Sequence, residues 1–315
     1  MRNFTSVYDV KDVYQLIQSA VHIKKSPLDN RELGSEKILG LIFMNPSLRT
    51  RLSTQKAGIN LGMDVVVMNF TGEGWALETG EGVVMDGNKA EHIKEAAAVI
   101  GEYCNIVGLR SFPGLKNREK DYSEEILNSF IKYSGVPVIS LESATRHPLQ
   151  TLADLITIEE YRDVKRPKVV MTWAPHPRAL PQSVPNSFVE WALLMDYDLV
   201  VTHPQGYDLN ESFMKDVPVE YDQDKALEGA DFVYVKNWSS YLDYGKVLNT
   251  DPEWMITAKK LANTRSAKVM HCLPVRRNVV IADDVLDSDH SIVIEEAANR
   301  VYSAQAVLKN ILNTM

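Results

Sequence analysis

Short apolar runs alternate along the whole chain with stretches in which apolar residues recur at helical spacing. The runs are rich in valine, isoleucine and leucine, a composition typical of parallel strands that are buried on both faces. Strands are therefore predicted at 37–44, 64–69, 104–110, 137–141, 168–173, 198–203, 231–235 and 268–272. Helices are predicted near 11–24, 48–61, 90–102, 123–133, 149–161, 184–194, 253–263 and 296–313.

The strands and helices alternate in two series, which predicts an α/β fold of two doubly wound parallel-sheet domains. The boundary between the two domains is placed near 141–149, because the segment from Glu142 to Leu149 is short, polar and contains a proline. The last helix, at 296–313, could pack on either domain. Residues 71–87 hold five glycines and Trp75 in a stretch too irregular for a regular element, which favours a functional loop.

The charge balance limits the kinds of partner. The 315 residues include 34 basic and 42 acidic side chains, which gives a formal net charge of −8 and a pI near 5.5. Nucleic acid and anionic membranes are therefore not expected partners, and an anionic ligand needs a local basic cluster. Only Cys104 and Cys272 are present, so no disulfide framework is expected, and no CxxC pair offers a zinc site. Without a long apolar run or a signal-like N-terminus, a cytoplasmic protein is predicted.

The sequence NPSLRTR at 45–51 directly follows the first strong strand and opens a helix. Ser47 is a good N-cap, and the helix carries an apolar stripe of Leu48, Leu52 and Ile59. Arg49 and Arg51 in the first turn oppose the helix dipole, which favours anions at that end. Either a bound anion offsets these arginines, or the motif is a capped helix whose arginines are solvated.

Two further motifs lie at the ends of predicted strands. His147-Pro148-Leu149-Gln150 offers a neutral donor pair for a carbonyl or amide, although a simple helix-start turn explains it equally well. His271-Cys272-Leu273-Pro274 follows the last strong strand, at an edge where α/β proteins bind ligands. A nucleophilic Cys272 is disfavoured because neighbouring strand residues point to opposite faces, so a pocket-lining role is expected.

Arg110, Lys236 and Arg300 add positive charge near strand or chain ends, where each alone is typical of a surface ion pair. Glu142 follows the strand at 137–141 and could be an exposed cap. Taken in order, SxRTR, HPxQ, HCLP and Asn299-Arg300 resemble the motifs of the transcarbamylase family across nearly the whole chain. That resemblance implies a carbamoyl-phosphate domain (1–141 plus 296–315), an amino-acid domain (142–295), and a homotrimer with shared active sites.

By resemblance, carbamoyl phosphate is the first substrate, and its contacts are Ser47, Leu48, Arg49, Thr50, Trp75, Arg110, His147, Gln150, Cys272, Leu273 and Arg300. Arg49, His147 and Cys272 are the residues given catalytic roles, with Cys272 acting through its backbone. The Leu273–Pro274 bond is expected to be cis. No cofactor or metal is required, and no general base is assigned.

The acceptor is inferred from departures within the family. Ornithine transcarbamylases follow the late strand with an aspartate and an SMG motif, whereas this chain has Lys236 and no SMG. A lysine can pair with a carboxylate but not with an ammonium, so the α-nitrogen of the acceptor is expected to be acylated. Leu48 and Trp75 resemble the N-acylornithine transcarbamylases, in which Trp75 would reach a neighbouring subunit's site. The expected acceptor contacts are Ala90, Glu142, His176, Lys236, Leu273 and Arg276.

The acyl group is inferred from Ala90 and Val280. Acetylornithine relatives carry a glutamate and a lysine at these positions, and succinylornithine relatives carry a proline at the first, so Ala90 fits neither pattern. A neutral residue at 90 removes charge repulsion against a second carboxylate, which favours N-succinyl-L-ornithine. Carbamoyl transfer to its δ-amino group, in arginine biosynthesis, is the implied reaction. N-acetyl-L-ornithine, then ornithine, and a catalytically silent anion-binding homologue remain the alternatives.

Overall fold

The computed structural model describes residues 1–70 and 74–315, so the first three residues of 71–87 lie outside the described residues. The described chain divides into two compact units. The first unit contains Met1–Gly114, Glu119–Leu149 and Arg300–Met315, and the second contains Leu115–Arg118 and Gln150–Asn299. Two borders fall inside helices α6 (Pro148–Tyr161) and α12 (Val293–Leu312). The domain bounds drawn from the sequence, with their substrate roles, stay a prediction.

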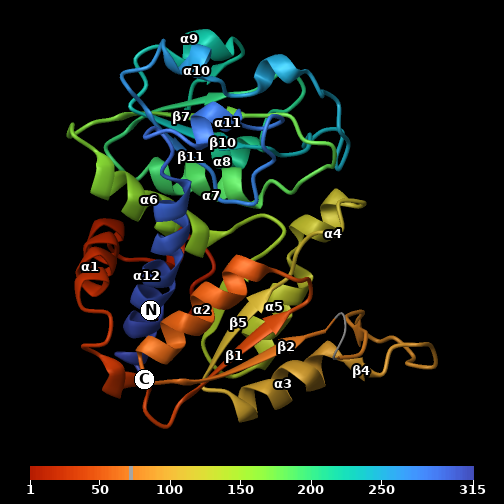
Figure 1. Ribbon diagram of the computed structural model, residues 1–315. Coiled ribbons are helices and arrows are strands. Elements are labelled where there is room, and N and C mark those ends of the chain that lie inside the picture. The colour runs from red at the N-terminus through yellow and green to blue at the C-terminus, as the bar shows by residue number, and fades with distance from the viewer. Residues whose placement is uncertain (71–73) are drawn as a thin grey trace. The chain divides into compact units, whose positions relative to one another are not determined.

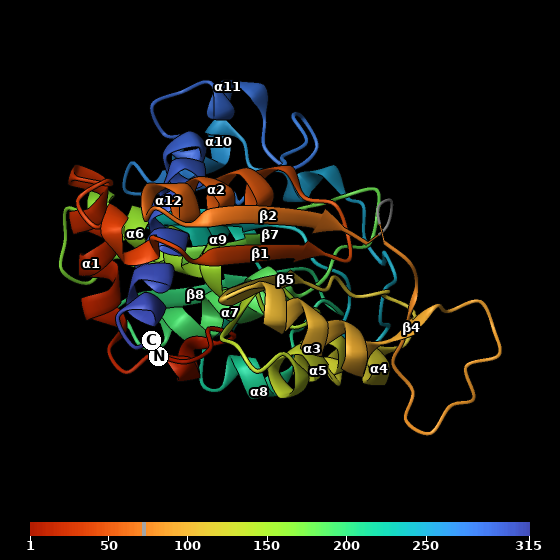
Figure 2. The ribbon, with the colours of Figure 1, turned by 90° about the horizontal axis from the view of Figure 1, so that it is seen from below.

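The first unit is built on a four-stranded sheet in the order β2-β1-β5-β6, in which all neighbours are parallel. Its strands are β1 (Ile38–Phe43), β2 (Asp64–Asn69), β5 (Ile106–Arg110) and β6 (Val138–Glu142). Helix α2 covers one face, and α3 and α5 cover the other (Figure 2). These helices span Leu48–Asn60, Ile93–Tyr103 and Glu125–Tyr133. The strand order reverses between β1 and β5, so ligands are expected beyond the carboxyl ends of these two strands.

A compact apolar cluster holds α3 and α5 against this sheet. It contains Ile93 from α3, Phe130 from α5 and Leu109 from β5, all almost fully buried. On the other face, the residues of α2 toward the sheet are small, and a Cβ at Gly58 would meet Leu39 and Val65 at 2.9 Å. The close approach of α2 to the sheet therefore requires a small side chain at this position.

The apolar stripe of Leu48, Leu52 and Ile59 on α2 does not face the core of the first unit. These three side chains are 68%, 57% and 50% exposed, and the buried side of α2 is formed by Thr50, Ser53, Thr54, Ala57, Gly58 and Asn60. Helices α2 and α12 lie side by side (Figure 1), and at the end of α2 Asn60 donates a 3.0 Å hydrogen bond to Gln305 of α12. Polar anchoring and close approach to the sheet, rather than an apolar stripe, therefore orient α2.

The second unit has a five-stranded parallel sheet in the order β11-β10-β7-β8-β9. The strands are β7 (Lys168–Trp173), β8 (Asp198–Thr202), β9 (Val219–Glu220), β10 (Phe232–Lys236) and β11 (Lys268–Met270). The strand order reverses between β7 and β10, which again marks a ligand-binding edge. Helix α7 (Ser183–Ala192) is buried along its whole length, and its Phe188 packs on Tyr234 of β10.

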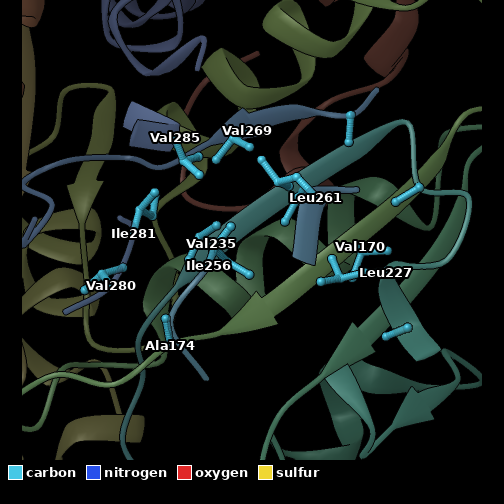
Figure 3. Packing of buried hydrophobic residues seen from close by; sticks show 14 residues of the cluster. Val170, Ala174, Leu227, Val235, Ile256, Leu261, Val269, Val280, Ile281 and Val285 are labelled. Atoms are coloured by element: carbon cyan, nitrogen blue, oxygen red, sulfur yellow. The ribbon is translucent and has the colours of Figure 1, made fainter. Parts of the chain in front are cut away.

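A second apolar cluster lies on the opposite face of that sheet, where Val170, Val235 and Val269 come from three neighbouring strands (Figure 3). Leu261 and Val285, from short helices, complete the packing. Val235 directly precedes Lys236 in β10, so this core fixes the strand end at which the candidate site lies.

The fold class is confirmed, and all eight predicted strands are present. The prediction of one helix at 253–263 is wrong, because Ile256 is extended, fully buried and paired with Ile281. Several short elements were not predicted from the sequence. One of them is the two-residue strand β3 (Leu77–Glu78), which lies within 71–87. The remaining elements are η1 (Val7–Asp9), α1 (Val13–Lys25), η2 (Arg31–Gly34), β3 (Leu77–Glu78), β4 (Glu91–His92), α4 (Arg118–Tyr122), α8 (Glu211–Met214), α9 (Gln223–Leu227), η3 (Pro252–Trp254), α10 (Ala258–Leu261) and α11 (Asp283–Leu286). Within 1–70 and 74–315, the helices are all too short or too polar to cross a membrane.

Candidate active site

The loop from β1 into α2 forms the centre of the candidate site in the first unit. Ser47 is the N-cap of α2 by backbone conformation, but its side chain makes no capping hydrogen bond in the described structure. Arg49 is half-buried and Thr50 is buried in the first turn. The first backbone N–H groups of the helix lack partners within a helix, so this end can bind an anion.

Arg110 lies at the end of β5, next to β1, and is 8% exposed. Its Nη1 donates to the carbonyl oxygens of Asn45 and Pro46, both at 3.1 Å. Its Nη2 donates to Oε2 of Glu142 at 2.9 Å. Among the described residues, the buried Nε of Arg110 has no hydrogen-bond partner. Arg110 is therefore held firmly beside the loop that precedes Ser47, and its Nε–H remains as a further hydrogen-bond donor.

His147 and Glu142 flank the turn that leads into α6. Nε2 of His147 lies 3.9 Å from Oε2 of Glu142, and both side chains are buried. The turn between them is anchored by Glu124, whose carboxylate accepts hydrogen bonds from Ser143 and Thr145. Glu142, an expected acceptor contact, is thus engaged by Arg110 in this structure.

Arg300 reaches the same helix terminus from the other end of the chain. Its Nη2 donates a 2.6 Å hydrogen bond to Oγ1 of Thr50, and it is 6% exposed. The structure therefore places Thr50 and Arg300 together, 250 residues apart in sequence. In the first unit, the predicted carbamoyl-phosphate residues fall into two groups: Arg110 and His147, which both lie beside the expected acceptor residue Glu142, and Thr50 with Arg300.

A second cluster lies at the carboxyl edge of the sheet in the second unit. His176 follows β7, Lys236 ends β10, and Arg276 follows β11. Nε of Arg276 donates a 3.1 Å hydrogen bond to Nε2 of His176. Partial burial lowers the pKa of His176 from its ordinary value, and the positive charges of Arg276, Lys236 and Arg178 lower it further. The field at this edge is positive and suits a ligand with carboxylates.

The HCLP segment follows β11 directly. The Leu273–Pro274 bond is cis, as the family resemblance predicted, and Leu273 has a φ of 53°. The backbone N–H of Leu273 donates to Nδ1 of His271 at 2.8 Å. The Cys272 side chain is buried and not disulfide-bonded.

The sequence predicted that Gln150 donates a hydrogen bond to a ligand, but in the structure its side-chain nitrogen donates to two buried carboxyl groups. Its Nε2 donates to Oδ1 of Asp154 at 2.7 Å and to Oε1 of Glu296 at 3.3 Å. Sequence reasoning missed both carboxylates. The spacing of Gln150 and Asp154 by four residues on one predicted helix was the available signal, since such residues are neighbours on a helix surface.

Trp75 lies shortly before β3 and Ala90 lies immediately before β4, the two short strands that pair in parallel. Trp75 is 56% exposed, and its Nε1 donates a 3.0 Å hydrogen bond to Glu91. Ala90 is exposed immediately before β4. Across residues 1–70 and 74–315, histidine, cysteine, aspartate and glutamate side chains form no group of three suited to a metal ion.

Comparison with known proteins decides the family. The description "Aspartate/ornithine carbamoyltransferase, carbamoyl-P binding domain" matches residues 2–160, and the "Asp/Orn binding domain" of the same family matches residues 181–311. The chain belongs to the aspartate/ornithine carbamoyltransferase family. The transcarbamylase resemblance drawn from the sequence motifs is thereby confirmed.

Relatives within this carbamoyltransferase family are similar over most or all of the chain. The N-succinylornithine carbamoyltransferase of Bacteroides fragilis (strain 638R) is 56% identical over 317 residues, covering 100% of both chains. The N-acetylornithine carbamoyltransferase of Xanthomonas campestris pv. campestris is 37% identical and covers 88% of both chains. A crystal structure of a glutamate-to-alanine mutant of N-acetyl-L-ornithine transcarbamylase, complexed with carbamyl phosphate and N-succinyl-L-norvaline, has a TM-score of 0.91. That structure is 34% identical and covers 99% of this chain and 100% of its own.

Proposed function

We propose that this carbamoyltransferase transfers the carbamoyl group of carbamoyl phosphate to the δ-amino group of N-succinyl-L-ornithine. The products are N-succinyl-L-citrulline and phosphate. The observation that carries the proposal is the 56% identity over the whole chain to an N-succinylornithine carbamoyltransferase, against 37% to an N-acetylornithine carbamoyltransferase. The positive edge formed by His176, Lys236 and Arg276 agrees with an acceptor that carries two carboxylates.

The phosphate of carbamoyl phosphate is bound at the N-terminus of α2 in this proposal. The backbone N–H groups near Ser47 and Leu48, with Arg49 and Thr50, supply donors and one positive charge. Arg110 and Arg300 supply further positive charge, His147 supplies a hydrogen-bond donor, and Trp75 comes from a neighbouring subunit. Charge-assisted contacts to a dianion are about twice as strong as neutral hydrogen bonds, which suits this cluster to the task.

The acceptor is bound through its carboxylates by Lys236, Arg276 and His176, with further contacts from Glu142 and the Leu273 backbone. Ala90 leaves room for the end of the succinyl group. Two like unit charges 4 Å apart repel each other by about 4 kcal/mol at an effective dielectric constant of about 20. A glutamate at position 90 would therefore disfavour a succinyl carboxylate, and an alanine would not.

The chemical step needs only positioning and charge stabilisation. The neutral δ-amine attacks the carbamoyl carbon, a C–N bond forms, and the bond between that carbon and the phosphate oxygen breaks. Arg49 and His147 stabilise the negative charge that develops, and the backbone of the Cys272 segment holds the carbamoyl amide. The departing phosphate accepts the proton that the amine loses.

We also propose a homotrimer in which Trp75 acts in a neighbouring subunit's site. The support is exposed apolar side chains on the first unit: Leu48, Leu52 and Ile59 on α2, and Val66 and Met68 on the face of the edge strand β2 that points away from α2. Exposed apolar surface of this kind is typical of an interface between subunits. The reaction would belong to arginine biosynthesis in the cytoplasm, because its product is a citrulline derivative.

N-acetyl-L-ornithine is the second candidate acceptor, since the N-acetylornithine carbamoyltransferases are also full-length relatives. Plain ornithine is disfavoured because Lys236 would repel its α-ammonium group. A silent homologue is disfavoured because Arg49, Arg110, His147, Gln150 and Arg300 are all present.

The direct test is colorimetric detection of the ureido product after incubation with carbamoyl phosphate and N-succinyl-L-ornithine. Parallel reactions contain ornithine or no acceptor. We expect product only with the acylated acceptor. Product with ornithine alone would contradict the proposed acceptor class, and no product with any ornithine derivative would contradict carbamoyl transfer itself.

A further inference from the structure

Three cationic side chains lie at the carboxyl edge of the sheet in the second unit without a carboxylate partner. Lys236 ends β10, and Arg178 and Arg276 lie in the loops that follow β7 and β11. Across residues 1–70 and 74–315, none of the three forms an ion pair with an aspartate or a glutamate. Arg277, which follows Arg276 directly, instead binds two aspartate carboxylates at 3.0 and 2.7 Å. The edge therefore carries positive charge that the described part of the chain does not neutralise.

The imidazole ring of His176 lies between the two arginines of this edge. Its Nδ1 is 2.8 Å from the backbone oxygen of Arg178 and 3.1 Å from the backbone nitrogen of the same residue. On the other side of the ring, Nε2 accepts a 3.1 Å hydrogen bond from Nε of Arg276. A neutral imidazole whose Nε2 accepts has its proton on Nδ1, so Nδ1 donates to the Arg178 oxygen. Only one ring therefore separates the backbone of Arg178 from the guanidinium of Arg276.

The side chain of Arg178 is exposed, and only its backbone contacts His176. Within the described ranges, its guanidinium makes neither a hydrogen bond nor an ion pair. Burial has the largest effect in lowering the pKa of His176, and the positive charge of Arg178 adds to it, in agreement with a guanidinium on this edge. The side chain can therefore bind a ligand here without losing a contact to the described residues.

The number of cations matches an acceptor that has two carboxylates. N-succinyl-L-ornithine carries one carboxylate on its α-carbon and one at the end of the acyl group, whereas N-acetyl-L-ornithine carries only the first. Lys236 is buried at the strand end, which suits the carboxylate that both acceptors share. Arg178 and Arg276 are exposed, and a guanidinium can bind a carboxylate through two parallel hydrogen bonds. The two arginines therefore suit the carboxylate of the longer acyl group.

We propose that Arg178 is a specificity-determining residue, which binds the acyl carboxylate of N-succinyl-L-ornithine together with Arg276. This inference rests on the proposed function and names the contact by which the second unit distinguishes the two acyl groups. An acetyl group offers no charge to Arg178, so the binding of an acetylated acceptor does not depend on this residue.

The test compares the parent with the Arg178→Gln variant in binding two non-reactive analogues, N-succinyl-L-norvaline and N-acetyl-L-norvaline. Calorimetry in the presence of carbamoyl phosphate gives the dissociation constant of each. The succinyl analogue should bind about tenfold more weakly to the variant, because a contact between two charged groups is lost. The acetyl analogue should bind within about twofold of the parent, because it makes no such contact. In turnover, KM for N-succinyl-L-ornithine should rise while kcat changes little.

Three further variants separate the proposed contact from a general effect of charge. Arg265→Gln is the matched control, because Arg265 is exposed at the amino edge of the same sheet, where it pairs with Asp231 at 3.2 Å. It removes one positive charge from the same unit and should leave both dissociation constants unchanged. At position 178, Arg178→Lys should weaken the succinyl analogue less than Arg178→Gln does, and Arg178→Glu should weaken it more. A purely structural role would not follow this order of charge.

The outcomes separate this inference from the proposed function. A parent protein that transfers no carbamoyl group to an ornithine derivative would contradict the proposed function. An active parent whose Arg178→Gln variant binds both analogues as tightly as before, or weakens both equally, would overturn the inference alone. Should Arg178→Gln not fold, Arg178→Lys decides, because it keeps the charge and removes the guanidinium. We then expect a loss of about threefold for the succinyl analogue only, and an unchanged affinity would overturn the proposal.

Discussion

Arg276 donates a hydrogen bond through Nε to Nε2 of His176 at 3.1 Å, although 100 residues separate the two in the chain. The two loops that carry them follow β11 and β7, which lie on either side of β10. An accepting Nε2 requires a neutral imidazole. Partial burial lowers the pKa of His176, and Arg276, Lys236 and Arg178 lower it further, in agreement with that neutral state.

This relationship predicts a pH dependence of acceptor binding. A bound carboxylate raises the pKa of His176, so binding takes up a proton between the free-state and bound-state pKa values. The affinity for a non-reactive succinyl analogue such as N-succinyl-L-norvaline should rise as the pH falls through the bound-state pKa. It should level off below the free-state pKa, which is lowered from the ordinary histidine value by partial burial and nearby positive charge. Calorimetry in the His176→Asn variant should show a flatter profile, and the same slope in both proteins would contradict the assignment.

Arg49 is expected to bind the phosphate of carbamoyl phosphate directly. Removing a charge-assisted contact costs about 1.5–3 kcal/mol, so Arg49→Ala should lose about tenfold to a hundredfold or more in kcat/KM. Arg51→Ala is the matched control, since Arg51 is exposed on the same helical turn. Equal, small effects of both substitutions in folded proteins would show that the turn is only a helix start.

Trp75 is expected to act across a subunit boundary. In a trimer that mixes Trp75→Ala and Arg49→Ala chains, about one site in three combines an intact Trp75 with an intact Arg49. Mixing the two inactive proteins under conditions that exchange subunits should therefore restore activity. No activity in trimers shown by mass spectrometry to be mixed would place Trp75 outside the neighbouring site.

Ala90 is expected to permit the longer acyl group. Ala90→Glu should lower kcat/KM for N-succinyl-L-ornithine more than for N-acetyl-L-ornithine, because only the succinyl group brings a second carboxylate near the new charge. The matched Ala90→Gln variant adds a similar volume without charge and should change the ratio less. An unchanged ratio in Ala90→Glu would mean that position 90 does not contact the acyl group.

The long strands were predictable because short, nearly continuous apolar runs such as KVVMTW are typical of parallel strands that are buried on both faces. The two-residue strand Val219–Glu220 was not, because a pairing that short leaves no periodic pattern. The apolar stripe on α2, which includes Leu52 and Ile59, was recognised from the sequence, but the face on which it lies was not. An apolar stripe on a helix predicts that this face is buried, but it does not tell whether the same chain or another subunit buries it.

The candidate residues themselves were found from motifs, but their partners were not. Glu142 was expected to contact the acceptor, and the structure shows its buried pairing with Arg110 at 2.9 Å. Gln150 was assigned without the acid pair that orients it, because Glu296 is 146 residues away in sequence. Contacts of such range depend on how the sheet brings strand ends together, which a pattern along one chain does not reveal.

The acceptor preference is the measurement that tests the central proposal most directly. Initial rates at saturating carbamoyl phosphate give kcat/KM for N-succinyl-L-ornithine and for N-acetyl-L-ornithine in the same preparation. We expect a clear preference for the succinyl acceptor, at least about tenfold, because one additional carboxylate pairing contributes at least about 1.4 kcal/mol. A higher kcat/KM for N-acetyl-L-ornithine would contradict the proposed function.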